Sequence, residues 1–231
     1  MIKENISRLK EDISLICQRL GRNPGEITVV AVTKYGTVAM IEETLHAGIS
    51  HIAENKVQEA LKKFGSFKPP EIKLTRHMIG HLQTNKVKEA LKVFDVIQSV
   101  DSLKLAASLD KAGEKLNRII EGLVQVNTSG ETQKYGIAND EAMKLIRQIS
   151  QFDFIRVLGL MTIAPLADDR EVIRDCFRKL RQLRDRVSNE TAGYPHVQMK
   201  YLSMGMSSDY AVAIEEGSNM VRIGRAIFSH V

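Results

Sequence analysis

The stretch ITVVAVTK, residues 27–34, decides the fold. Its continuous run of apolar and β-branched residues is typical of a strand that is buried on both faces in a parallel sheet. A parallel strand needs a crossover helix before its neighbour. The next residues supply one, because the apolar residues of 40–45 form one helical face and Gly48 ends it. The stretch and its sequel therefore predict a βα unit.

The same alternation continues along the chain. Seven further strands are predicted, and helical patterns separate most of them. The strands are expected at 51–53, 73–79, 96–100, 119–126, 155–161, 198–202 and 220–223, and the helices at 57–64, 87–94, 103–116, 141–149, 172–187 and 210–216. Eight such alternations favour a single α/β domain over 1–231, a (β/α)₈ TIM-type barrel, rather than an open sheet.

An additional amphipathic helix opens the chain. Apolar residues recur at steps of three and four from Ile2 to Leu20, and Gly21 follows as a stop signal. We expect residues 1–21 to form a helix that packs on the barrel. Only nine residues follow Arg222, too few for a full eighth helix, so this opening helix is predicted to fill that place against the last strand.

Composition is typical of a globular protein. Hydrophobic residues make up 43% and charged residues 26% of the chain. No apolar run approaches the ~18 residues of a membrane helix, and the first ten residues lack the apolar core of a secretory signal. We therefore expect a cytoplasmic protein with no membrane contact. Cys17 and Cys176 share helical faces with apolar residues, which suits buried thiols without a catalytic role.

The net charge of +5 raises nucleic-acid binding as an alternative function. Arginines concentrate at 174–186, yet apolar residues recur on the opposite face of the same predicted helix. Aromatic residues, which would stack on bases, are not interleaved with them. A solvated helix face is the favoured interpretation, and no nucleic acid is expected as a partner. The alternative would show a steep salt dependence of binding.

Lys34 ends the most hydrophobic strand of the sequence. In barrels of this class the C-terminal ends of the strands form the active-site face. An ammonium group is costly to bury, so this lysine either extends to water or has a lowered pKa that makes its amine nucleophilic, as Schiff-base chemistry requires. Taken alone, the local sequence favours the first alternative.

The loops after the last two predicted strands contain residues that could bind a phosphate. They contain YLSMGMSSDY at 201–210 and NMVRIGRAIFS at 219–229, and barrels often bind a phosphate there. Ser203 offers a hydroxyl, and the amides of Gly224 and Arg225 can donate to phosphate oxygens without a side chain. A nucleophilic lysine combined with a phosphate site is what pyridoxal 5′-phosphate (PLP) demands.

Seven ordered blocks carry a resemblance that covers essentially the whole chain. They are AVTKY at 31–35, HIAENKVQEA at 51–60, HMIGHLQTNK at 77–86, QVNTSGETQKYG at 125–136, GLMTIAP at 159–165, LSMGMSSDY at 202–210 and VRIGRAIF at 221–228. These blocks resemble the PLP-binding protein family of vitamin B6 homeostasis, whose fold is similar to the N-terminal barrel of bacterial alanine racemase.

The resemblance implies a set of site residues. Lys34 would form the Schiff base with PLP, and Arg222 would face the pyridine nitrogen. The expected cofactor-binding residues are Lys34, Asn55, Met161, Ser203, Met204, Arg222, Gly224 and Arg225, with Ser203 and the amides of the last two on the phosphate. Two residues depart from the family pattern. Arg225 stands where a small hydroxyl residue is usual, and Arg76 replaces an aromatic residue beside the block at 77–86.

The same resemblance bears on catalysis. A guanidinium only donates hydrogen bonds, so Arg222 would leave the cofactor a weak electron sink. A racemase also needs an acid or base on each face of the substrate carbon. In alanine racemases a tyrosine from an additional β-domain serves one face, and this chain stops at Val231, directly after the barrel.

We therefore expect a monomer or weak dimer that holds PLP and supplies or buffers it for PLP-dependent apoenzymes, without robust catalytic activity. The alternative is a PLP-dependent amino-acid racemase of low activity, with Tyr35 or Tyr135 as the opposite-face acid.

Two weaker patterns are interpreted structurally. His77 and His81 lie four residues apart, but no acidic third ligand is near, so we expect no metal and favour hydrogen bonding near the barrel mouth. The residues 207–209 read as the N-cap region of the helix that starts near Tyr210.

Overall fold

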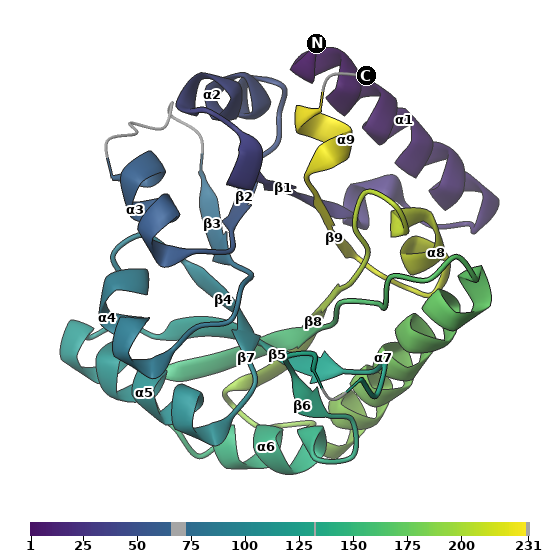
Figure 1. Ribbon diagram of the computed structural model, residues 1–231. Coiled ribbons are helices and arrows are strands. Elements are labelled where there is room, and N and C mark those ends of the chain that lie inside the picture. Colours follow the sequence, from purple (N-terminus) through teal and green to yellow (C-terminus); the bar gives the residue numbers. More distant parts are fainter. Residues whose placement is uncertain (66–72, 132, 230–231) are drawn as a thin grey trace.

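The computed structural model describes residues 1–65, 73–131 and 133–229. Its strands close into a parallel barrel, which Figure 1 shows end-on inside a ring of helices. Each barrel strand pairs with the next, β1 pairs with β9, and pairing between β4 and β5 completes the ring. The barrel strands are β1 (Thr28–Val32), β2 (His51–Glu54), β3 (Thr75–Met78), β4 (Val96–Val100), β5 (Ile120–Asn127), β7 (Ile155–Met161), β8 (Val197–Ser203) and β9 (Met220–Ile223). The predicted (β/α)₈ barrel is confirmed.

One strand was not predicted. The short β6 (Ile137–Ala138) pairs with the end of β5 and lies outside the barrel ring. It belongs to the long connection between β5 and α6, in the loop above the barrel. The strand therefore orders a loop on the C-terminal face rather than adding to the barrel wall.

The helices lie close to their predicted positions, except for the four-residue α9, which was not predicted. They are α1 (Ile2–Arg19), α2 (Val38–His46), α3 (Val57–Phe64), α4 (Val87–Ala90), α5 (Leu103–Leu116), α6 (Ala142–Ile149), α7 (Arg170–Glu190), α8 (Tyr210–Glu215) and α9 (Arg225–Phe228). Only α4 is much shorter than expected. After Ala90 the chain tightens into i→i+3 turns, with the amide of Lys92 on Glu89 O and that of Val93 on Ala90 O.

The opening helix closes the helical ring. α1 packs against α2, α8 and α9, and its buried face carries Ile2, Ile6, Leu9, Ile13, Ile16 and Cys17. The buried side chain of Asn5 donates to Ile227 O of α9 over 3.1 Å. The place of an eighth helix is thus shared by the four-residue α9 and by α1, which contacts the helix after the last strand (Figure 1).

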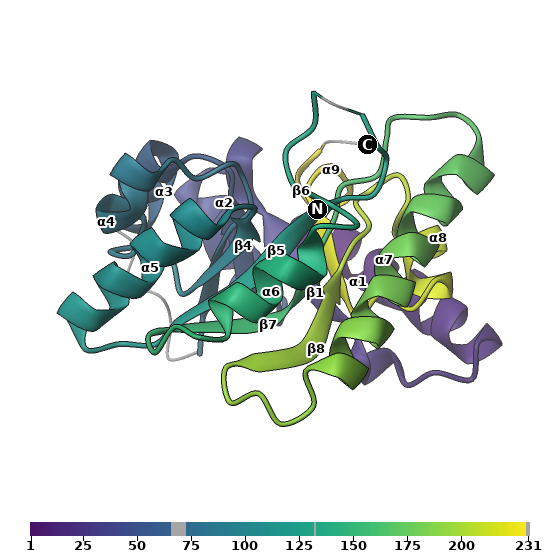
Figure 2. The same cartoon turned by 90° about the horizontal axis from the view of Figure 1, so that it is seen from below.

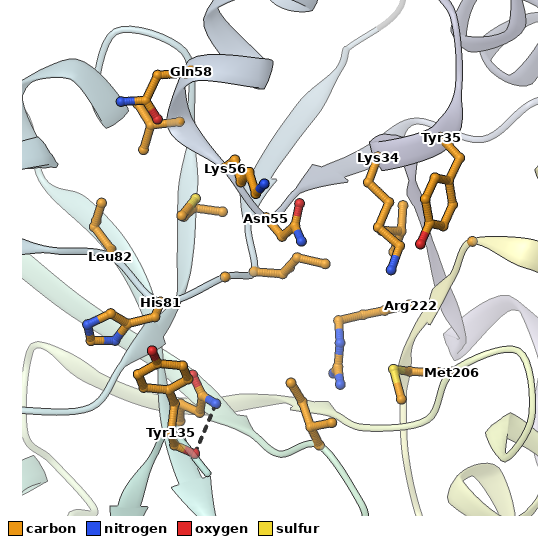
Figure 3. A pocket seen from close by; sticks show the side chains of 18 of the residues that line it. Lys34, Tyr35, Asn55, Lys56, Gln58, His81, Leu82, Tyr135, Met206 and Arg222 are labelled. Carbon is orange, nitrogen blue, oxygen red and sulfur yellow. Dashed lines mark hydrogen bonds between the residues drawn. The ribbon is translucent and has the colours of Figure 1, made fainter. Parts of the chain in front are cut away.

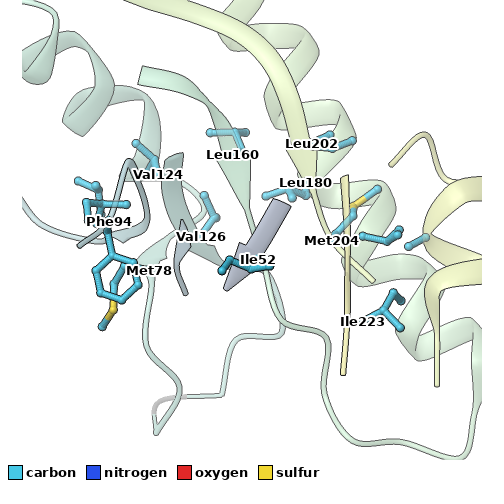
Figure 4. Packing of buried hydrophobic residues seen from close by; sticks show 14 of the residues in the cluster. Ile52, Met78, Phe94, Val124, Val126, Leu160, Leu180, Leu202, Met204 and Ile223 are labelled. Atoms are coloured by element: carbon cyan, nitrogen blue, oxygen red, sulfur yellow. The ribbon is translucent and has the colours of Figure 1, made fainter. Parts of the chain in front are cut away.

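Alternation along the strands separates two apolar layers. In β1, Val30 and Val32 belong to a small cluster inside the barrel, whereas Ala31 belongs to the large layer between strands and helices. Figure 4 shows part of that outer layer, with Leu180 from α7 and Leu202 from β8. Buried polar side chains, among them Gln98, Ser203 and Arg222, share the barrel interior with the inner cluster.

The predicted solvated face of α7 carries arginines that form ion pairs with a neighbouring helix. Arg174 contacts Glu215 Oε2 at 2.6 Å and Glu216 Oε1 at 3.2 Å, and Arg181 lies 3.3 Å from Glu216 Oε2. These pairs join α7 to the end of α8, which runs beside it (Figure 2). Much of this basic cluster therefore serves helix packing.

Cys17 and Cys176 are buried, and burial raises the pKa of both thiols. Across the described ranges, no helix has the length and apolar character needed to cross a membrane.

Candidate cofactor site

A cavity of ≈ 820 Å³ opens at the C-terminal ends of the barrel strands. Its walls come from the ends of β1, β3, β5 and β9 and from the segments that follow β1, β2, β3, β5, β7, β8 and β9. Lys34, Asn55 and Arg222 extend toward the same space, with Met206 on one side (Figure 3). A cavity of this size is in the range that holds small molecules and cofactors.

The cavity is lined by cations. Five basic side chains contribute, and none of the described residues in its lining is Asp or Glu. They are Lys34, Lys56, Lys86, Arg222 and Arg225. Such an excess of one sign in a concave site attracts a ligand of the opposite sign. The site therefore suits an anionic ligand.

Lys34 follows β1 directly. The strand ends at Val32, and Thr33–Tyr35 form a 3₁₀ turn that points the lysine into the cavity. The side chain is exposed, and Nζ lies 4.7 Å from the centroid of the Tyr35 ring. Of the two alternatives for this lysine, the structure thus shows an amine that reaches solvent in the cavity, steadied by an aromatic face.

A buried ion pair holds that turn from below. Glu54, at the end of β2, is fully buried, and its Oε1 accepts from Lys63 Nζ at 2.7 Å and from Thr33 Oγ1 at 2.8 Å. Lys63 Nζ also donates to Thr33 O at 2.7 Å. The residue before Lys34 is therefore fixed through both its side chain and its backbone.

Arg222 provides a buried cation beneath the cavity. It lies in β9 and is 3% exposed. Nη1 donates to Ser203 Oγ at 2.8 Å and Nη2 to Thr162 O at 2.7 Å. Burial lowers the pKa of Arg222 to about 10, and the nearby carboxylate of Asp209 opposes that shift. The side chain remains a cation and a pure donor at neutral pH.

The structure brings together five of the eight predicted cofactor residues. Lys34, Asn55, Arg222, Gly224 and Arg225 all line the cavity. The amides of Gly224 and Arg225 donate to no acceptor in the described part of the chain, so they are available to a ligand.

The other three predicted residues lie elsewhere. Met161 packs in the cluster inside the barrel, and Met204 packs in the outer layer because it points away from the barrel interior. Ser203 is fully buried, and its hydroxyl donates to Gln98 Oε1 at 2.7 Å while accepting from Arg222. With both roles of the hydroxyl used, Ser203 supports Arg222 and does not reach the cavity.

A different serine, Ser207, which was not among the predicted residues, brings a hydroxyl to the cavity. Ser207 lines the cavity, and its Oγ accepts from the amide of Ala226 at 3.2 Å. The chain reverses at Gly205, whose φ of +97° favours glycine, and this turn returns the loop to the cavity. The N-cap of α8 is Asp209, whose Oδ1 accepts from the amide of Met206 instead of capping the helix.

His77 and His81, the two histidines four residues apart, lie in different surroundings. His81 lies at the cavity, stacked on Tyr135 at 4.3 Å between ring centroids, with Nδ1 3.2 Å from Asp101 Oδ2. His77 lies inside the barrel instead, and burial together with the nearby His51 lowers its pKa to about 3. In the described segments no group of three or more His, Cys, Asp or Glu could hold a metal ion.

Arg76, which departs from the family pattern, pairs with Asp95. Its guanidinium makes a two-point contact with Asp95, with Nε on Oδ2 and Nη2 on Oδ1, both at 3.0 Å. Arg76 lies near the start of β3 and Asp95 directly precedes β4, at the end of the barrel opposite to the cavity. Arg76 therefore ties two strand starts together and lies away from the cofactor residues.

These features fit PLP. The aldehyde needs an accessible amine, the phosphate needs donors and positive charge, and the ring needs apolar walls with a polar contact to its nitrogen. The cavity offers the exposed amine of Lys34, the unused amides of Gly224 and Arg225, the buried guanidinium of Arg222, and apolar walls from Val32 and Met206.

Comparisons with known proteins agree with this site. Residues 5–230 match the family model described as "Alanine racemase, N-terminal domain". The "Pyridoxal phosphate homeostasis protein" of Aquifex aeolicus is 39% identical over 225 residues, which cover 97% of this chain and 96% of that protein. The corresponding protein of Escherichia coli K12 is 36% identical, over 98% of this chain and 95% of its own.

A solved structure extends the comparison. PipY of Synechococcus elongatus PCC7942, with PLP bound, superposes with a TM-score of 0.85 at 31% identity, over 99% of this chain and 100% of that one. Both the sequence matches and this structure span nearly the full length of each partner. The chain belongs to the pyridoxal phosphate homeostasis protein family, within the alanine racemase N-terminal domain group.

Proposed function

We propose that this protein binds PLP covalently through Lys34 and acts in PLP homeostasis, holding the cofactor and supplying or buffering it. One observation carries the proposal: the exposed Lys34 amine and the buried Arg222 guanidinium share a cavity whose described lining contains no acidic residue. The full-length relatives named pyridoxal phosphate homeostasis protein, and the PLP bound to PipY, support it. We also propose the cytoplasm as its location and PLP-dependent apoenzymes as recipients.

The phosphate contacts are proposed from the loops after β8 and β9. The amides of Gly224 and Arg225 would donate to phosphate oxygens, and the guanidinium of Arg225 adds positive charge. Ser207 replaces Ser203 in this proposal. Its Oγ accepts from Ala226 N, which leaves its own proton free to donate toward the cavity. Ser207 would thus give the phosphate a hydroxyl contact although residue 225 is an arginine and not the usual small hydroxyl residue.

Arg222 would face the ring nitrogen and limit the chemistry. When bound, PLP supplies an electron sink, and that sink is strongest when the ring nitrogen is protonated. Arg222 has no proton acceptor to offer and therefore favours the unprotonated nitrogen. The arrangement suits storage of the cofactor better than carbanion chemistry, and we propose a carrier without robust catalytic activity.

The racemase alternative depends on the two cavity tyrosines. Tyr35 contacts the Lys34 amine through its ring face, so it lies on the same side of the site as the lysine. Tyr135 lines the cavity from the segment after β5 and stacks on His81. If a tyrosine serves as the acid on the face opposite to Lys34, that tyrosine is therefore Tyr135.

A titration of the purified protein with PLP tests the proposal. Binding should produce an absorbance band that Lys34→Ala abolishes and that Lys56→Ala, which removes another cavity lysine, retains. A band of equal intensity in Lys34→Ala would contradict the assignment. Conversion of L-alanine to D-alanine distinguishes the alternative: rapid conversion that is lost in Tyr135→Phe would establish a racemase.

A further inference from the structure

A continuous chain of hydrogen bonds runs through the barrel interior beneath the cofactor site. It begins at Arg222 Nη1, which donates to Ser203 Oγ at 2.8 Å, and Ser203 Oγ donates to Gln98 Oε1 at 2.7 Å. Gln98 Nε2 lies 2.9 Å from His77 Nδ1, and His77 Nε2 lies 2.9 Å from His51 Nδ1. Five residues from five strands thus form one line.

The line joins the two ends of the barrel. Arg222 lines the large cavity at the C-terminal end, and His51, the first residue of β2, lines a cavity of ≈ 340 Å³ at the N-terminal end. The three residues between them are buried, with exposures of 0% for Ser203 and Gln98 and 1% for His77. Buried polar groups of this kind need partners, and here each finds one in the chain.

Every hydrogen bond in the line points the same way. The Gln98 amide nitrogen has two hydrogens, and its second acceptor is Met220 Sδ at 3.3 Å. A reversed amide would set its oxygen against that sulfur. It would also leave the Ser203 hydroxyl, which already accepts from Arg222, without an acceptor for its own proton, so the amide nitrogen faces His77. His77 Nδ1 must therefore accept, and its proton lies on Nε2. That proton points at His51 Nδ1, which accepts in turn, so His51 carries its proton on Nε2.

We propose that Ser203, Gln98 and His77 are positioning residues for Arg222. Through this one-directional chain they hold the guanidinium at a fixed angle, so that its remaining N–H groups face the cofactor ring. The inference rests on the proposed PLP site, because it assigns these residues a task toward the group that Arg222 contacts. Ser203, the predicted phosphate ligand, acts on the ring through Arg222.

Of the three residues, Ser203 has the most direct effect on Arg222, because its hydroxyl contacts the guanidinium. Nη2 of Arg222 is fixed by Thr162 O, so the Ser203 hydroxyl provides the second point that prevents the guanidinium from rotating. Without that hydroxyl, Nη1 loses its acceptor and Gln98 Oε1 loses its donor at once. The polar interior of a barrel tolerates such a loss poorly, since each orphaned group is desolvated.

The cofactor-free protein allows a direct test of the chain. Long-range ¹H–¹⁵N NMR of the histidine rings should show both His77 and His51 protonated on Nε2. In Gln98→Glu a carboxylate oxygen replaces the donor facing His77 Nδ1, so the proton of His77 should appear on Nδ1. A wild-type His77 protonated on Nδ1, or no change in Gln98→Glu, would overturn the proposed direction.

The link to the cofactor is tested with matched serine variants. Ser203→Ala should weaken PLP binding about tenfold or more, the scale of one hydrogen bond to a charged group, and should shift the absorbance maximum of bound PLP. Ser203→Thr, which keeps the hydroxyl, should restore both. Ser99→Ala is the control, because Ser99 is also fully buried near the end of its strand but its hydroxyl has no partner in the described residues.

The outcomes separate the two proposals. If wild-type protein and Ser99→Ala both bind PLP through Lys34, and Ser203→Ala binds it with unchanged affinity and spectrum, the positioning role is wrong and the proposed function stands. If neither wild-type nor control binds PLP, the proposed function fails and the positioning role fails with it. A loss shared equally by Ser203→Ala and Ser99→Ala would indicate general destabilisation and also overturn the positioning role.

Discussion

Removal of the cation beneath the Lys34 turn should destabilise the protein strongly. Lys63 Nζ lies 2.7 Å from Glu54 Oε1, and the side chains are 16% and 0% exposed. At an effective dielectric constant of about 20, that distance corresponds to an attraction of about 6 kcal/mol. Desolvation offsets much of it in the wild type, but Lys63→Met leaves the carboxylate buried without its cation. We expect the free energy of unfolding to fall by about 3–5 kcal/mol.

Urea denaturation of the cofactor-free protein at neutral pH measures this loss. Adding Glu54→Gln to Lys63→Met should recover most of it, because a neutral amide needs no cation. Lys62→Met is the matched control. That lysine is 75% exposed and pairs with Glu59 on the surface, so its replacement should cost less than about 1 kcal/mol. A Lys63→Met loss no larger than the control's, or no recovery in the double variant, would refute the reasoning.

Single contacts support three further predictions. Gly80→Ala should destabilise the protein and disturb the cavity, because its Cβ would lie 2.2 Å from the backbone oxygen of Asn55, and urea denaturation that matches wild type would contradict this. As pH falls from 6.5 toward 3, the unfolded chain gains a proton at His77 that the folded protein does not. Stability should then drop by up to about 1.4 kcal/mol per pH unit, and His77→Gln should flatten the curve; an equal slope in both proteins would count against it. Ser207→Ala should weaken PLP binding by about tenfold whereas Ser208→Ala should not, as equilibrium dialysis can show; equal affinities would exclude the Ser207 contact.

The barrel and its lysine were predictable because their signals are local. The β-branched run of β1 and the periodicity of helices such as α5 depend on neighbours within a few residues, and α5 matches its predicted bounds at both ends. The same local logic identified Lys34 as the residue at a strand end. It overstated the apolar surroundings, since the chain leaves the strand at Val32 and turns the lysine into an exposed cavity.

The assignment of the two serines depends on contacts that a sequence pattern does not contain. Ser203 points into the barrel, where Arg222, from another strand, and Gln98, 105 residues away along the chain, take up its hydroxyl. Ser207 reaches the cavity only because the backbone reverses at Gly205. The hydrogen-bond chain through His77 likewise joins five strands. Long-range pairing of this kind becomes visible only once the barrel is closed.

Covalent attachment at Lys34 is the central claim, and peptide mapping tests it most directly. The protein loaded with PLP is reduced with borohydride, digested, and analysed by mass spectrometry. We predict a single reduced cofactor adduct, on the peptide that contains Lys34. An adduct on Lys56 or Lys86, the other lysines of the same cavity, with Lys34 unmodified, would contradict the account.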